Sequence, residues 1–126
     1  MQGSKYQYLQ DINKIVLCAG HGGDNSPGNN YDPGSTNGQR READENIYLT
    51  KKIAQILREM GLSVDEAPHN LNLQPTINWL NQTYPNWTSN SSNKAWVIEI
   101  HRDWNNPNME EARKNDQCGI YYWGRP

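Results

Sequence analysis

Hydrophobic positions along this chain form short apolar runs that alternate with segments of helical spacing. The apolar runs predict four strands, at residues 15–19, 62–67, 95–101 and 119–123. Apolar residues at helical spacing predict a helix over 44–60 that is ended by Gly61, and Pro75 opens a second, shorter helix. Strands that alternate with helices indicate an α/β fold, with a twisted, mostly parallel sheet flanked by helices.

Length and charge narrow the classes of function. A chain of 126 residues has the size of one domain, which we assign to residues 1–126. The 12 Lys and Arg residues against 14 Asp and Glu residues give a formal net charge of −2. This balance indicates neither nucleic acid nor an anionic membrane as a partner. We see no signal peptide and no segment of membrane-spanning length, so the sequence predicts a chain made without an export signal.

A long loop rich in glycine, asparagine and proline, at 20–39, separates the first predicted strand from the first helix, and its length suggests a function. His21 follows the first strand and His101 closes the third, so both fall at the sheet edge where ligands gather in open α/β folds. Glu42 lies at the far end of the loop, which can fold back and bring its carboxylate to the same edge. Two histidines and one glutamate form a catalytic zinc ligand set with an open position for water. Taken singly, each has a simpler interpretation, as a hydrogen-bonded edge histidine or a glutamate that favours the helix dipole.

The motifs around these residues resemble a known family. "IVLCAGHGGDNSPG", "READENIYLTKKIAQILREMGLSV", "VIEIHRD" and "GIYYW" occur in the order found in zinc-dependent N-acetylmuramoyl-L-alanine amidases of the Amidase_3 type, bacterial cell-wall hydrolases and phage endolysins. The resemblance spans about 14–123. It implies that His21, Glu42 and His101 bind Zn²⁺, and that the glycines let the backbone turn sharply and leave room for metal and substrate.

The resemblance also implies a substrate and a place of action. The substrate is peptidoglycan, cleaved at the amide between N-acetylmuramic acid and L-alanine by water that the zinc activates. A phage endolysin of this type stays in the cytoplasm until it is released and then acts at the bacterial cell wall.

The general base is where the chain departs from the family pattern. Family members carry a glutamate for this role near their C-terminal end, and no residue here corresponds to it. Glu99 stands where the family often has serine, and strand alternation places it on the same face as His101. Glu99 is therefore a candidate catalytic base, or else it hydrogen-bonds a metal ligand or the backbone. Two alternative functions follow: a peptidoglycan-binding module without turnover, and half of a split amidase whose partner chain completes the sheet.

Other residues have two interpretations each. Cys18 is a candidate metal ligand or a small buried hydrophobe. His69 is a candidate substrate contact or a plain loop residue. Tyr31 and Trp104 offer flat faces to a sugar or peptide, or serve only in packing.

Overall fold

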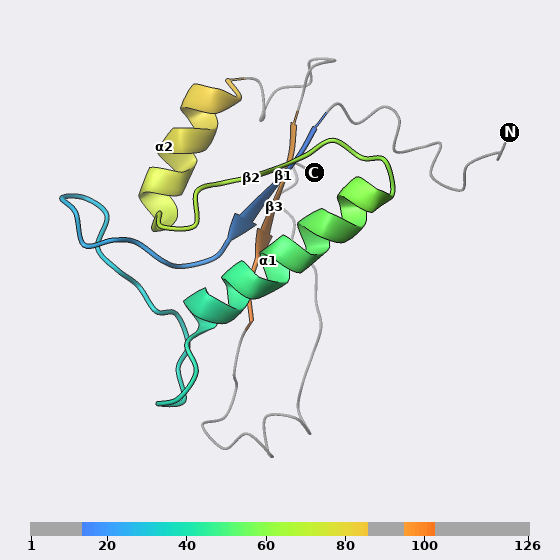
Figure 1. Ribbon diagram of the computed structural model, residues 1–126. Coiled ribbons are helices and arrows are strands. Elements are labelled where there is room, and N and C mark those ends of the chain that lie inside the picture. The colour runs from blue at the N-terminus through green and yellow to red at the C-terminus, as the bar shows by residue number, and fades with distance from the viewer. Residues whose placement is uncertain (1–13, 86–94, 103–126) are drawn as a thin grey trace, which may run out of the picture.

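A computed structural model describes residues 14–85 and 95–102 of the chain. The described elements are β1 (Lys14–Ala19), α1 (Glu42–Glu59), β2 (Val64–Glu66), α2 (Leu73–Thr83) and β3 (Ala95–Ile100). The three strands are all parallel and lie in the order β2-β1-β3, so that β1 is central (Figure 1). The predicted α/β class with a parallel sheet is confirmed for this part of the chain. The predicted strand at 119–123 lies outside the described residues.

The alternation of side chains along β1 divides the core into two clusters, one on each face of the sheet. The cluster against α1 contains Ile15, Leu17, Ala54, Val64 and Ile100. The cluster on the face of α2 contains Val16, Cys18, Ala67, Leu80 and Ala95. Each helix therefore covers one face of the central strand, and the strand is buried on both sides, as its uniformly apolar sequence predicts.

The start of α1 differs from the prediction. The helix begins at Glu42 rather than at residue 44, and its N-cap residue, Arg41, makes no side-chain capping bond. Carbonyl groups of the preceding loop act as the cap, because Glu42 N–H donates to Ser35 O and Ala43 N–H donates to Pro33 O. Caps supplied by a distant backbone leave no signature in the local sequence, and this explains the error.

The end of α1 is as predicted to within one residue. Gly61 has φ +85°, and the N–H groups of Gly61 and Leu62 donate to the carbonyls of Arg58 and Leu57. This pair of bonds is a Schellman motif, in which glycine adopts the left-handed conformation without strain. Because Leu62 belongs to this motif, β2 begins only at Val64 and is shorter than the predicted 62–67.

Helix α2 begins two residues before the predicted Pro75. Asn72 is its N-cap, with its side-chain oxygen accepting a hydrogen bond from Leu73 N–H at 2.7 Å. Pro75 is the third helical residue, where a missing N–H costs nothing because first-turn N–H groups have no partner within the helix. No helix in the described part of the chain combines the length and apolar character needed to cross a membrane.

The loop between β1 and α1 is held to the rest of the domain by a buried asparagine. Asn29 is 5 % exposed, and its Nδ2 donates to Asn70 O at 2.8 Å while its Oδ1 accepts from Asn72 N–H at 2.7 Å. Within the loop, Gly22 and Asp32 exchange both backbone hydrogen bonds, each 2.8 Å long. These bonds fold the loop back on itself, so that its last residues return to the sheet edge from which it left.

Candidate metal centre

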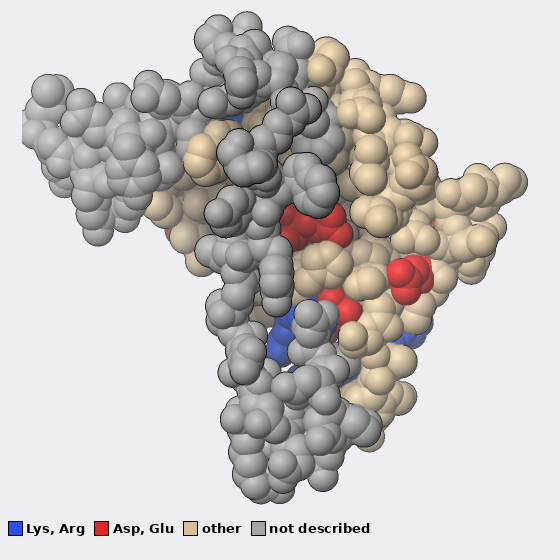
Figure 2. Space-filling view, turned by 180° about the vertical axis from the view of Figure 1, so that it is seen from behind, with Lys and Arg blue, Asp and Glu red and all other residues tan. Residues whose placement is uncertain are grey.

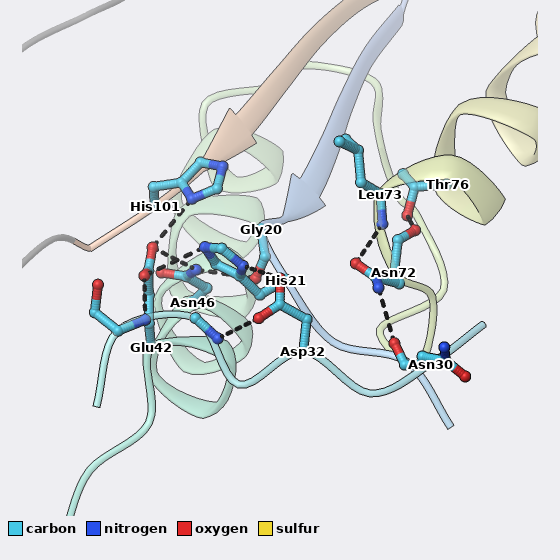
Figure 3. Close-up of polar contacts among 12 residues, drawn as sticks. Gly20, His21, Asn30, Asp32, Glu42, Asn46, Asn72, Leu73, Thr76 and His101 are labelled. Carbon is cyan, nitrogen blue, oxygen red and sulfur yellow. Dashed lines mark hydrogen bonds and ion pairs between the residues drawn. The ribbon is translucent and has the colours of Figure 1, made fainter. Parts of the chain in front are cut away.

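Three side chains from separate elements meet at the carboxyl end of the sheet. His21 follows β1, Glu42 is the first residue of α1 and His101 follows β3 (Figure 3). One ligand atom from each lies within 4.8 Å of the others. Glu42 is 1 % exposed, whereas both histidines reach the surface in part. The structure therefore brings together the three residues that the sequence singles out as metal ligands.

Glu42 is fixed by donors from both sides of the centre. Ser35 N–H donates to Oε2 at 2.9 Å, and Arg102 N–H donates to Oε1 at 3.0 Å. Asn46 Nδ2 contacts Oε1 at 3.4 Å and donates to Gly20 O at 3.0 Å, which ties the first turn of α1 to the end of β1. Burial alone would raise the pKa of Glu42, but hydrogen bonds from Ser35, His101 and Arg102 lower it below its ordinary value. The buried carboxylate is therefore ionised at neutral pH.

His21 is held in an uncommon backbone conformation. Its φ of +65° lies in the left-handed region, which non-glycine residues rarely adopt and which clusters at functional sites. Its Nδ1 lies 2.8 Å from Asp32 Oδ2, and its Nε2 lies 3.3 Å from Glu42 Oε2. The imidazole thus bridges a carboxylate on the loop and the buried carboxylate of α1.

His101 has the same kind of bridging position with the ring nitrogens exchanged. Its Nδ1 lies 3.0 Å from Glu42 Oε1, and its Nε2 lies 2.6 Å from Glu99 Oε1. Mainly because of the bond to Glu99, and further because of Glu42, the pKa of His101 is raised to about 9. A proton on Nδ1 therefore lies between His101 and Glu42 in the metal-free chain at neutral pH.

Two glycines allow the ligand side chains to approach the backbone. A Cβ at Gly20 would lie 2.6 Å from His101 Nε2. A Cβ at Gly34, whose φ is +66°, would lie 2.6 Å from His21 Cδ2 and 2.7 Å from Glu42 Oε2. At these two positions the missing side chain leaves room for the ligands themselves.

The three side chains lie close enough together to hold a metal ion. Two ligand atoms that are each about 2.0–2.1 Å from a tetrahedral metal ion lie about 3.4 Å apart. His21 Nε2 lies 3.3 Å from Glu42 Oε2 and His101 Nδ1 lies 3.0 Å from Glu42 Oε1, and one ligand atom from each of the three residues lies within 4.8 Å of the others. Neutral imidazole and carboxylate suit zinc and several other divalent metals, so the donor set alone does not select one metal.

Charged groups around the centre are largely paired. Figure 2 shows acidic and basic side chains intermixed on one face of the molecule. Glu45, in the first turn of α1, pairs with Arg102 at 2.5 Å and with Arg40 at 3.5 Å, and Arg41 pairs with Asp44 at 3.5 Å. The described surface near the centre thus has no block of one sign that would bind a polyanion.

The remaining candidates from the sequence lie in different places. Cys18 is 2 % exposed in the core, where burial and then Glu99 raise the pKa of its thiol to about 12, so it behaves as a small apolar residue. His69 Nε2 lies 3.3 Å from Glu66 Oε1, apart from the three ligands. The guanidinium of Arg41 lies 5.9 Å from the ring centroid of Tyr31. Trp104 lies outside the described residues.

Two contributors to the centre were missed from the sequence. Asn46 lies one helical turn after Glu42, so this i, i+4 spacing was a usable signal once Glu42 was placed at the helix start. Asp32 lies in the middle of the loop, and no spacing rule connects it to His21. The contact between them depends on the path of the loop, which local sequence does not determine.

The charge state of His101 leads to a prediction for the metal-free chain. The folded-state pKa is about 9 against an ordinary value of 6.5, so the folded form binds the proton more tightly than the unfolded form. The stabilisation is complete below pH 6.5 and is lost as the pH rises through 9. We expect the melting temperature, measured with a chelator present, to fall over this range, and His101→Gln to remove most of the fall. An unchanged slope in the variant would contradict the assignment.

Comparison of the chain with protein-family models, with curated proteins and with solved structures found no match. The sequence motifs and the geometry of this centre are therefore the features of the chain that indicate its function.

Proposed function

We propose that this chain is a zinc-dependent amidase domain that hydrolyses the amide between N-acetylmuramic acid and L-alanine in peptidoglycan, at the bacterial cell wall. The observation that carries the proposal is the convergence of His21, Glu42 and His101 within 4.8 Å. These are the three residues that match the ligand motifs of the Amidase_3 type, and they come from three separate parts of the sequence. The choice of zinc and of the substrate is supported by the motif resemblance.

Each residue of the centre has a definite task in this proposal. Bound zinc would polarise the scissile carbonyl and lower the pKa of a water molecule. Glu42 supplies a negative charge that stays ionised, since its hydrogen bonds outweigh the effect of burial. His21 and His101 each present one ring nitrogen towards Glu42, with the other nitrogen occupied by a carboxylate. The chain's own residues thus hold three ligand atoms in place before a metal arrives.

A small cavity adjoins the centre on the side of α2. It is lined by Cys18, Ala19, His21, Leu73, Thr76 and Glu99. Cys18, Ala19 and Leu73 form its apolar wall, and His21, Thr76 and Glu99 are its polar or charged members. The cavity has room for about one water molecule, so it offers space for a water beside the centre and not for a side chain of a substrate.

Glu99 favours a second candidate function, binding without turnover. Its carboxylate is bonded to His101 Nε2 at 2.6 Å, and this bond is the main reason that the pKa of Glu99 lies below its ordinary value. A general base works best with a pKa near the working pH, so a carboxylate of lowered pKa is a weak one. A peptidoglycan-binding module that holds metal and substrate but cleaves slowly is therefore the alternative.

The test measures cleavage and binding in the same preparation. Zinc-loaded chain is incubated with purified peptidoglycan, and released stem peptides with a new L-alanine amino terminus are quantified by mass spectrometry, while co-sedimentation measures binding. If Glu99 acts as the base, Glu99→Gln should lower the cleavage rate about 100- to 10,000-fold when the zinc content of the variant equals that of the wild type, with peptidoglycan binding retained. Glu59→Gln is the matched control, because Glu59 lies at the exposed far end of α1, where its Oε1 accepts a hydrogen bond from Gln55 Nε2 at 3.2 Å.

The outcomes separate the two candidate functions. Binding without peptide release by the wild-type chain would favour the module over the enzyme. A zinc-loaded chain that neither binds nor cleaves peptidoglycan would contradict both.

A further inference from the structure

Each histidine of the metal centre has a carboxylate on the side that faces away from Glu42. Asp32 Oδ2 lies 2.8 Å from Nδ1 of His21, and Glu99 Oε1 lies 2.6 Å from Nε2 of His101. The two carboxylates therefore contact opposite ring nitrogens. The nitrogens left facing Glu42 are Nε2 of His21 and Nδ1 of His101.

A neutral imidazole carries one N–H and one lone pair, and an ionised carboxylate accepts hydrogen bonds but donates none. When a metal ion replaces the hydrogen between each histidine and Glu42, the ring nitrogen that still faces Asp32 or Glu99 must carry the remaining hydrogen. The nitrogen on the Glu42 side then offers its lone pair to the metal. Carboxylate partners of this kind fix both the tautomer and the orientation of metal-binding histidines.

We propose that Asp32 is a positioning residue of the centre, which holds His21 as the Nδ1–H tautomer so that Nε2 binds the metal. Glu99 does the converse for His101, which binds through Nδ1. The inference rests on the metal centre of the proposed function, but it does not depend on the substrate or on turnover. It assigns a role to Asp32 and makes the coordination mixed, with one ligand nitrogen of each type.

Asp32 is built to hold one orientation. Its second carboxylate oxygen, Oδ1, accepts a hydrogen bond from Gly34 N–H at 2.9 Å. Its backbone N–H and carbonyl both pair with Gly22, next to His21, at 2.8 Å. The side chain is therefore anchored at both ends, directly opposite a histidine whose backbone is in the left-handed conformation at φ +65°. A residue held in so unfavourable a conformation needs its surroundings to determine it, and Asp32 supplies one of those contacts.

This anchoring gives Asp32→Asn a specific effect. Gly34 N–H requires an oxygen at the Oδ1 position, so the amide NH₂ of the new asparagine takes the position that faces His21 Nδ1. An NH₂ group donates, and this selects the tautomer of His21 with the hydrogen on Nε2. That tautomer has no lone pair for a metal at Nε2, so the substitution works against binding without changing the size of the side chain.

The experiment reads the tautomers directly. Long-range ¹H–¹⁵N NMR of the zinc-loaded wild-type chain should show hydrogen on Nδ1 and metal on Nε2 of His21, with the reverse for His101. Asp32→Asn should weaken zinc binding about 10- to 100-fold, measured by competition with a chelator. In the metal-free form of the variant, neutral His21 should carry its hydrogen on Nε2.

Asp24→Asn is the matched control. Asp24 belongs to the same loop, and the bonds from Ser26 N–H, Ser26 Oγ and Asn29 Nδ2 all end on its Oδ1, which an asparagine retains. This variant makes the same change of charge without contact to a histidine, so its zinc affinity and tautomers should match those of the wild type.

The possible outcomes distinguish this inference from the proposed function. Zinc on Nδ1 of His21 in the wild-type chain would overturn the inference, and so would equal losses of affinity in Asp32→Asn and Asp24→Asn. Zinc bound with the expected tautomers supports the inference even if peptidoglycan is not cleaved, a result that would count against the enzyme alone. A wild-type chain that binds no zinc would overturn both.

Discussion

The wild-type chain is expected to bind one zinc ion, and replacement of His21 or His101 by alanine is expected to abolish this stoichiometric binding. Each substitution removes one of three metal ligands. Loss of a residue that only hydrogen-bonds a ligand lowers metal affinity roughly 10- to 100-fold, and we expect loss of the ligand itself to lower zinc affinity further. Zinc in 1,000-fold excess over its Kd stabilises a folded protein by about 4 kcal/mol, which for this length raises the melting temperature by on the order of 10 °C. Elemental analysis and thermal melts with and without zinc measure both effects.

The third histidine of the chain supplies the control for this experiment. His69 lies beside Glu66 and is not one of the three residues of the metal centre. His69→Ala should therefore keep the zinc stoichiometry and the thermal shift of the wild type. Full zinc content in a variant lacking both His21 and His101 would show that the metal binds elsewhere.

Gly34→Ala is expected to eliminate tight zinc binding without touching a ligand residue. The added methyl group would lie 2.6 Å from His21 Cδ2 and 2.7 Å from Glu42 Oε2, so at least one ligand must move. The positive φ of +66° adds a backbone cost of about 1–2 kcal/mol, which lowers stability whether or not metal is present. Chelator competition and thermal melts separate the loss of affinity from the loss of stability.

Gly28→Ala isolates the backbone part of this effect. Gly28 lies in the same loop at φ +76°, and apart from its two chain neighbours no heavy atom of the described residues would lie within 4 Å of a Cβ there. The two variants should therefore lose similar stability from strain, whereas only Gly34→Ala should lose affinity for zinc. Equal zinc affinities in both variants would mean that the ligands do not need the space at Gly34.

The positions of the ligands were predictable because the topology fixes them. His21 and His101 follow strands that run parallel, so their side chains had to reach the same sheet edge once the apolar runs were recognised as strands. Prediction of the position of Glu42 required one further assumption, that the loop after the first strand folds back to that edge. The structure places all three as the sequence pattern requires.

The partners of these ligands were not predictable, because they come from contacts distant in sequence. Arg102 N–H reaches Glu42 across 60 positions, and Asp32 reaches His21 across 11 positions of irregular loop. The carbonyls of Ser35 and Pro33 cap the start of α1, although both residues lie several positions before the helix. Hydrogen-bond donors and acceptors of the backbone are the same for nearly every residue, so sequence patterns carry little information about such contacts.

The wide spacing of the three ligands along the chain gives a bound ion the character of a cross-link. His21 follows the central strand, Glu42 lies in the first turn of α1, and His101 follows a neighbouring strand. Glu42 and His101 are 59 positions apart in the sequence. An ion shared by all three would close two long loops of the folded chain, and the entropic cost of closing a loop grows only slowly with its length. The loop, the start of α1 and the ends of β1 and β3 would then open and close together as one cooperative unit, in place of separate segments that fray independently.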